Sequence, residues 1–226
     1  MTAAGAAPDE LLDAWAALAA HQLGEAMSLV SGYASLLREQ YAGTLGPGVD
    51  DALQGMLNGT ERLRRYVDDL LDLQHARDPA EGTADLDAAL AGAVEELRVF
   101  IERAKARVES GALGQAAVAP AKAERLFSHV VRGALAAGAR RVDVEAEAGD
   151  GTVAVVASDD GEAVDAKRAA GLLEPFATPR GHGPLVGAGV GMIVCRRIAE
   201  AAGGGIAVGP APAGGLRVTV SLPGPG

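Results

Sequence analysis

The chain has 226 residues and a formal net charge of −10, and 49% of its residues are hydrophobic although only 3% are aromatic. This acidic balance argues against nucleic acid or an anionic membrane as the main partner, because both attract basic surfaces. The single cysteine, Cys195, excludes an internal disulfide and favours a reducing, cytoplasmic location. No apolar run approaches the roughly 20 residues that span a bilayer, so we expect no membrane anchor.

A long amphipathic helix is predicted over about residues 8–40. Its apolar residues recur at alternating intervals of three and four, which marks one buried stripe. His21 lies two positions from both Ala19 and Leu23 of this stripe, so a rotation of about 200° turns the imidazole toward solvent. An exposed imidazole can act as a nucleophile near neutral pH, although a solvated surface histidine with no role is the alternative.

A second helix is predicted over about residues 49–76, after a loop at 42–48 that is dense in Gly and Pro. The steps of three and four in its seam run through Leu53, Met56, Thr60, Leu63, Val67, Leu70 and Gln74. Two such helices joined by a short loop form an antiparallel hairpin. Because a lone hairpin exposes much of its stripe, we expect a homodimer in which two hairpins form a four-helix bundle. Packing of the hairpin on its own C-terminal domain is the alternative.

The polar segment at residues 77–86 contains Pro and Gly and is predicted to be a linker between a helical domain at 1–76 and a second domain at 87–226. Helices of the second domain, the first capped by Asp87, are expected at about 87–105, 120–138, 167–173 and 190–202. Strands are expected near 107–113, 116–118, 141–148, 152–158, 205–208 and 216–222. This order predicts an α/β sandwich with helices on one face of a mixed sheet. The fold class of the whole chain is therefore predicted as α+β.

Two stretches of the second domain indicate a nucleotide site. Asp159 ends a predicted buried strand, where a carboxylate can accept a hydrogen bond from the amino group of a base such as adenine. Gly187, Gly189 and Gly191 lead into a predicted helix, and glycines there let backbone N–H groups approach a phosphate. A flexible turn is the alternative for this glycine spacing.

In this order, the motifs resemble the dimerisation and catalytic core of bacterial sensor histidine kinases, over about residues 11–223. His21–Met27 resembles the phosphoacceptor box of the phytochrome-like branch. Asp159–Gly161 resembles the adenine-contacting box, and Glu174–Phe176 resembles the phenylalanine box. The resemblance implies that His21 carries phosphate, flanked by Gln22 and Glu25. It implies that any nucleotide-binding residues are Asp159, Gly161, Gly187, Gly189 and Gly191.

The chain departs from the family pattern at the nucleotide site. Gly133 stands where the resemblance places an asparagine that helps to hold magnesium, and the only asparagine of the chain is Asn58. Ala163 replaces a glycine of the adenine box. Gln22 replaces the acidic residue that would act as a general base after the histidine. Loss of the metal-holding side chain should remove several kcal/mol of transition-state stabilisation. We therefore expect ATP and magnesium to bind weakly or not at all, and we assign no metal ligands.

Phosphate exchange between His21 and a response-regulator receiver domain needs none of the nucleotide pocket. A dimeric phosphorelay protein that uses His21 is therefore the leading hypothesis. The first alternative is an active ATP-dependent histidine kinase that holds its metal through Glu124 or water. The second alternative is a non-catalytic dimeric binding module. Arg180 and His182, in the short segment before the last glycine box, could contact a phosphate or lie in a solvated loop.

Overall fold

The computed structural model describes residues 8–41, 44, 46–76, 78, 80–149, 151–174, 177–181, 185–187 and 189–225, and the side chains of 8–21 and 47 lie outside this description. The chain divides into two compact units, Met1–Gln74 and His75–Gly226, which are described separately below. In the described part of the chain, no helix combines the length and the apolar character needed to cross a membrane.

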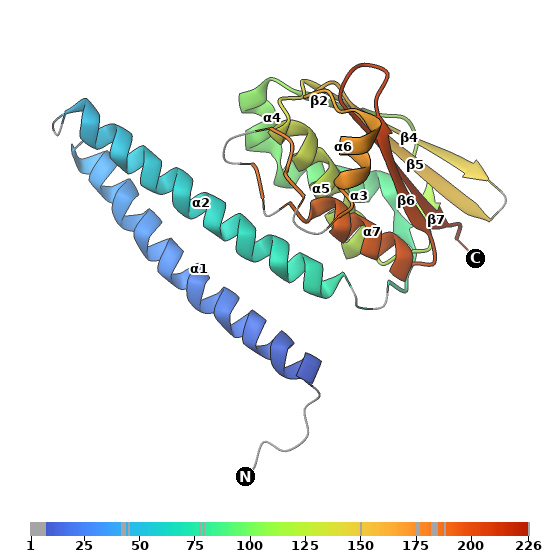
Figure 1. The fold of residues 1–226 in the computed structure, drawn as a ribbon, viewed down its shortest axis with the longest axis horizontal. Helices are drawn as coiled ribbons and strands as arrows, with labels where there is room; N and C mark the ends of the chain where they lie inside the picture. The colour runs from blue at the N-terminus through green and yellow to red at the C-terminus, as the bar shows by residue number, and fades with distance from the viewer. Residues whose placement is uncertain are drawn as a thin grey trace, which may run out of the picture. The chain divides into compact units, whose positions relative to one another are not determined.

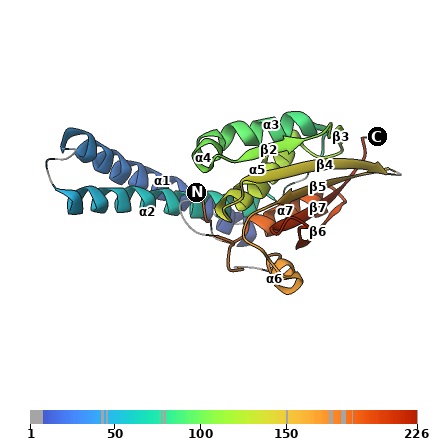
Figure 2. The same cartoon turned by 90° about the horizontal axis from the view of Figure 1, so that it is seen from above.

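The first unit is the predicted helical hairpin. Helix α1 (Pro8–Tyr41) and helix α2 (Pro47–His75) run side by side in both views (Figures 1 and 2). Ala34 and Leu53 are buried. The hydroxyl of Ser31 donates a hydrogen bond of 2.8 Å to the hydroxyl oxygen of Thr60. Part of the predicted seam is therefore buried within one hairpin.

The other part of the seam is exposed. The large apolar side chains that stay 40–53% exposed along the two helices include Leu23 (53%), Val30 (40%), Leu37 (44%), Met56 (49%), Leu63 (53%) and Leu70 (53%). The three residues on α1 recur at intervals of seven, and so do the three on α2. Each set therefore forms a row along one side of its helix. A single hairpin thus leaves a long apolar surface uncovered.

The second unit contains a five-stranded sheet in the order β2-β4-β5-β7-β6. The strands are β2 (Arg107–Ser110), β4 (Arg141–Gly149), β5 (Thr152–Asp159), β6 (Gly205–Pro210) and β7 (Leu216–Pro223). Strand β2 pairs parallel with β4, whereas the other pairings are antiparallel. The prediction of a mixed sheet is therefore confirmed.

The helices of this unit gather on one side of the sheet, as predicted (Figure 1). They are α3 (Leu86–Glu96), α4 (Arg98–Ala104), α5 (Pro120–Ala136), α6 (Ala166–Gly171) and α7 (Gly191–Ala201). Val142 and Val144 alternate with charged residues along β4 and are buried, as are Val131 of α5 and Val194 of α7. Each such side chain contributes about 1.5–3 kcal/mol on burial, so this core stabilises the packing of the helices on the sheet.

Asp85, and not Asp87, caps the first helix of the second unit. The carboxylate of Asp85 accepts a hydrogen bond of 3.0 Å from the backbone N–H of Ala88, which is the usual N-cap bond. The Asp87 carboxylate instead accepts the N–H groups of Leu113 and Gly114 at 3.1 Å. The predicted cap was therefore wrong by two residues, because Asp87 holds a segment that is distant in sequence.

Two further elements differ from prediction. The single helix expected over 87–105 is divided at Leu97, a buried residue with φ −96° and ψ 5° that ends one helix and begins the next. The strand expected at 116–118 is a short β3 (Gln115–Ala116), which pairs with β1 (Ala84–Asp85) in a separate two-stranded sheet. These short elements have too few residues for a periodic pattern to place them.

The segment before β1 is attached to the second unit. Lys122 of α5 donates its ammonium group to the backbone carbonyl of His75 at 3.2 Å and to that of Asp78. The N–H of Ala119 donates to the carbonyl of Ala80 at 2.8 Å. The described residues of the predicted linker are therefore held by α5 and by the β1–β3 pair.

Candidate functional site

The candidate phosphoacceptor lies on α1. The backbone of His21 is helical, but its side chain lies outside the described residues, so its exposure stays a prediction. Gln22 and Glu25 both have exposed side chains, and they are three residues apart, about one turn. Met27, two residues further, is buried. This part of α1 therefore presents polar side chains beside the position of His21.

Asp159 ends β5 on the side of the sheet that faces the helices, since it pairs with the buried Val142. Its two carboxylate oxygens accept hydrogen bonds from Arg180, from Nη1 to Oδ2 at 2.8 Å and from Nη2 to Oδ1 at 2.7 Å. Oδ1 also accepts the backbone N–H of Gly161 at 2.9 Å. The side chains of Asp159 and Arg180 are only 7% and 4% exposed. The carboxylate expected to contact adenine is thus already bound by a guanidinium.

This position of Arg180 corrects the expectation of a solvated loop, because the side chain is buried against Asp159. Its Nη2 also donates to the backbone carbonyl of Glu162 at 2.9 Å. The next residue, Gly181, donates its N–H to the Glu162 carboxylate at 2.8 Å. The ion pair with Arg168, at 2.7 Å, is the main cause that lowers the pKa of Glu162, and the Gly181 bond adds to it. His182 lies outside the described residues.

Glycines make this arrangement possible. Gly181 has φ +75°, and a β-carbon there would overlap the backbone carbonyl oxygen of Ala136. A β-carbon at Gly215 would overlap Oδ1 of Asp159. The backbone at Gly215 therefore lies directly against Asp159, whereas Gly181 lets the segment that carries Arg180 pass close to Ala136.

The last glycine box is partly described. Gly189 has φ +76°, and a β-carbon there would overlap the carbonyl oxygen of Ala177. Gly191 begins α7, and its β-carbon would lie 3.2 Å from Nδ1 of His129. Nη2 of Arg132 lies 2.8 Å from the same Nδ1. An imidazole and a guanidinium therefore lie beside the start of α7, where magnesium would require oxygen ligands.

The position expected to hold magnesium has no side chain but has space for one. A β-carbon added at Gly133 would meet no other atom within 4 Å. Glu124, the alternative metal ligand, is nine residues earlier on the same helix, about half a turn out of phase. Its carboxylate lies against α3, where a β-carbon at Gly92 would come 2.8 Å from Glu124 Cδ. Glu124 therefore lies on another face of α5 than Gly133, so it does not supply the ligand atom that Gly133 lacks.

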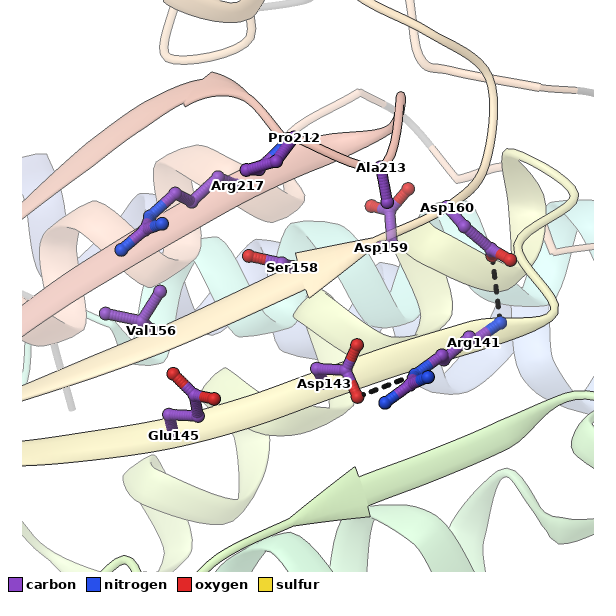
Figure 3. A pocket seen from close by; sticks show the side chains of 10 residues that line it. All are labelled: Arg141, Asp143, Glu145, Val156, Ser158, Asp159, Asp160, Pro212, Ala213 and Arg217. Carbon is purple, nitrogen blue, oxygen red and sulfur yellow. Dashed lines mark hydrogen bonds and ion pairs between the residues drawn. The ribbon is translucent and has the colours of Figure 1, made fainter.

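A pocket of about 310 Å³ lies on the outer face of the sheet (Figure 3). Asp143, Ser158 and Arg217 are paired across β4, β5 and β7 and line its floor. Arg141 in its wall donates to Asp143 at 2.9 Å, so opposite charges neutralise each other there. Asp159 and Asp160, which follow Ser158, also line this pocket, so it reaches the end of β5.

The sequence pattern did not indicate that Arg180 binds both Asp159 and the backbone carbonyl of Glu162. Arg180 is a lone arginine in a segment without periodicity, and Glu162 is one of 30 acidic residues. The two are 18 residues apart, and only the fold brings them together. An arginine located between the adenine box and the last glycine box was the one available signal.

Two family models match the chain. Residues 11–79 match the His Kinase A (phospho-acceptor) domain, and residues 119–226 match the Histidine kinase-, DNA gyrase B-, and HSP90-like ATPase family. In this order, the two domains identify the chain as a sensor histidine kinase core by its architecture. Proteins of this class in general dimerise and act with response regulators.

Known proteins with similar sequence or structure agree with this class. The Phytochrome-like protein Cph1 of Synechocystis sp. is 22% identical over 220 residues, which cover 94% of this chain but only 29% of that relative. Full-length ShkA, solved in complex with AMPPNP, has a TM-score of 0.67 at 20% identity, over 92% of this chain and 45% of ShkA. The Acinetobacter baumannii histidine kinase AdeS has a TM-score of 0.56 at 14% identity, over 87% of this chain and 94% of AdeS. At these identities, the structural likeness establishes the fold alone.

Proposed function

We propose that this histidine kinase core acts as a phosphotransfer protein: His21 exchanges a phosphoryl group with the aspartate of a response-regulator receiver domain. The observation that carries the proposal is the buried bidentate ion pair between Asp159 and Arg180, which occupies the carboxylate assigned to adenine. The lack of any ligand atom at Gly133 supports the same conclusion, because phosphoryl transfer from ATP depends heavily on the metal.

The transfer step needs only an accessible neutral imidazole. The lone pair of one ring nitrogen of His21 attacks the phosphorus of the receiver's aspartyl phosphate. A P–N bond forms while the P–O bond breaks, and the aspartate leaves as a carboxylate. The amide of Gln22 and the carboxylate of Glu25, both exposed, flank the position of His21 and would contact the incoming receiver. Because the receiver supplies the metal and acidic pocket for this step, the second unit of the chain takes no part in it.

The exposed apolar rows of α1 and α2 support a homodimer. Leu63 and Leu70 remain 53% exposed in one hairpin, although they belong to the same seam as the buried Leu53. Pairing with a second hairpin would remove this surface from water at about 25 cal/mol per Å². A four-helix bundle of two chains buries such rows in the usual way, with its polar faces available for docking.

The test compares two phosphate donors with the purified chain. One is a panel of receiver domains labelled with acetyl [³²P]phosphate, and the other is [γ-³²P]ATP with magnesium. We expect acid-labile label on the wild-type chain from the receivers and none from ATP. His21→Ala should abolish the label, whereas His75→Ala, an exposed histidine at the end of α2, should retain it. Label from ATP that requires His21 would establish the alternative, an active kinase. A chain that no donor labels would establish the binding module.

A further inference from the structure

We propose that Arg180 is an internal ligand of the nucleotide site, which competes with the adenine ring for Asp159 and must be withdrawn before a nucleotide can bind. This inference rests on the assignment of Asp159 to that site. It makes the loss of nucleotide binding a property of one side chain and its loop. The nucleotide site is then closed reversibly by Arg180. This closure is separate from the missing metal ligand at Gly133.

The ion pair competes directly with the base. The guanidinium offers two charge-assisted hydrogen bonds, at 2.7 and 2.8 Å, to the two oxygens of Asp159. The amino group of adenine would offer neutral N–H donors to the same carboxylate. Both oxygens cannot serve the two partners at once, because Gly161 and Gly215 enclose the carboxylate from other directions.

The loop that carries Arg180 is held through Glu162 as well as through Asp159. Gly181 donates to the Glu162 carboxylate, and Arg180 donates to the Glu162 carbonyl. Glu162 is exposed, and its further partner, Arg168, lies on the short helix α6 at the surface. We call the arrangement in which Arg180 binds Asp159 the docked state. It also requires glycine at position 181, because the carbonyl of Ala136 leaves no space for a β-carbon. Docking of the loop thus depends on Arg180, Gly181 and Glu162.

One feature of Arg180 opposes the docked state. Its Nε is buried, and no acceptor for it exists among the described residues. A buried donor without an acceptor loses its hydrogen bond to water and gains nothing in return. Withdrawal of the side chain would rehydrate this group, which partly offsets the loss of the ion pair. The ion pair outweighs the cost of the buried Nε, so the docked state is favoured, but the loop can still withdraw.

The experiment measures binding of trinitrophenyl-ADP to the full chain. Magnesium is left out, so that the missing metal ligand at Gly133 does not affect the measured affinity. The apparent affinity of a site is reduced by the fraction of molecules in which it is open. We expect Arg180→Ala to bind trinitrophenyl-ADP at least about tenfold more tightly than the wild type. A ten-to-one preference of the wild type for the docked state would produce this difference. Arg217→Gln, which changes an exposed arginine on the outer face of the sheet, should bind like the wild type. The double variant Asp159→Asn/Arg180→Ala should lose the gain.

A second variant tests the loop without removing Arg180. Gly181→Val cannot adopt the docked position, so it should show the same gain. Equal affinities of wild type, Arg180→Ala and Gly181→Val would overturn the proposal, whether all bind or none does. If neither variant folds, hydrogen exchange of residues 177–181 is measured in the wild-type chain with and without millimolar ADP. The proposal requires that ADP increases this exchange, because nucleotide binding withdraws the loop. None of these measurements involves His21. The result of this test therefore does not depend on whether the chain takes phosphate from receiver domains.

Discussion

The hydroxyl of Ser31 on α1 donates a hydrogen bond of 2.8 Å to the hydroxyl of Thr60 on α2, 29 residues away. Thr60 is the polar member of an otherwise apolar part of the seam, and its own hydroxyl donates to the carbonyls of Met56 and Leu57 at 3.1 and 3.0 Å. The two helices are therefore joined at one level by a polar contact. A bond of this kind favours one register of the hairpin over neighbouring ones.

Ser31→Ala should lower the free energy of unfolding of the hairpin by about 0.5–1.5 kcal/mol, the usual net value of one hydrogen bond. Thr60 keeps its backbone acceptors, so no buried donor is stranded. Urea unfolding followed by helical circular dichroism measures the change. Ser28→Ala, an exposed serine on the same helix, is the matched control and should differ little from the wild type. Equal losses in both variants would contradict a specific role for the Ser31–Thr60 bond.

Leu63→Lys should convert a dimer into a monomer. Leu63 is 53% exposed in one hairpin, so its replacement costs little within the chain, but a lysine in the paired bundle would bury a charge. Light scattering after size-exclusion chromatography should show the mass fall from two chains to one. Arg62→Ala, next to it and already exposed, should remain dimeric. A dimer that tolerates Leu63→Lys would mean that another surface pairs the chains.

Periodic elements were predictable from sequence, whereas contacts made by single residues were not. The apolar spacing of the two long helices and the alternation along β4 placed these elements to within a few residues, because burial of one face repeats along the chain. The choice between Asp85 and Asp87 as a helix cap depended on a segment some 26 residues away that claims Asp87. The bond between Arg180 and Asp159 likewise spans 21 residues and leaves no local pattern.

Asp160→Asn should reduce stability at neutral pH and have less effect in acid. The backbone N–H groups of Arg141 and then Arg140 donate to Oδ1 of Asp160, each at 2.8 Å, and they lower the pKa of its carboxyl. A lowered folded pKa stabilises the fold above the unfolded value of about 3.9, and this stabilisation is lost as the pH falls through the folded value. Because Asp160 is largely open to solvent, we expect about 1 kcal/mol at pH 7 after screening.

Urea unfolding of both proteins at pH 7, 4 and 3 checks this dependence on Asp160. The difference between wild type and Asp160→Asn should shrink toward pH 3. Glu147→Gln, an exposed carboxyl on β4, should give no such trend. A difference that is constant with pH would assign the effect to side-chain shape and not to charge.

Lys122→Met should loosen the segment that leads into the second unit. The Lys122 ammonium donates to the carbonyls of His75 and Asp78, and burial lowers its pKa. Methionine keeps the length of the side chain but donates no hydrogen bond. The amide of Asp78, which donates to the carbonyl of His75 at 3.1 Å, should then exchange its hydrogen several-fold faster. Lys167→Met, at an exposed lysine of α6, should leave this exchange unchanged.

Gly133→Asn should create a magnesium-dependent nucleotide site only when Arg180 is also removed. The space at Gly133 admits a side chain, and an asparagine oxygen is a ligand that magnesium accepts. In an Arg180→Ala background, magnesium should therefore tighten ADP binding to the Gly133→Asn variant. Gly133→Ala in the same background should gain about 0.5–1 kcal/mol of helix stability without any response to magnesium, because alanine has no ligand atom. Calorimetric titration with and without magnesium separates these outcomes. A magnesium response in Gly133→Ala would place the metal elsewhere, and none in Gly133→Asn would mean that this position does not face the phosphates.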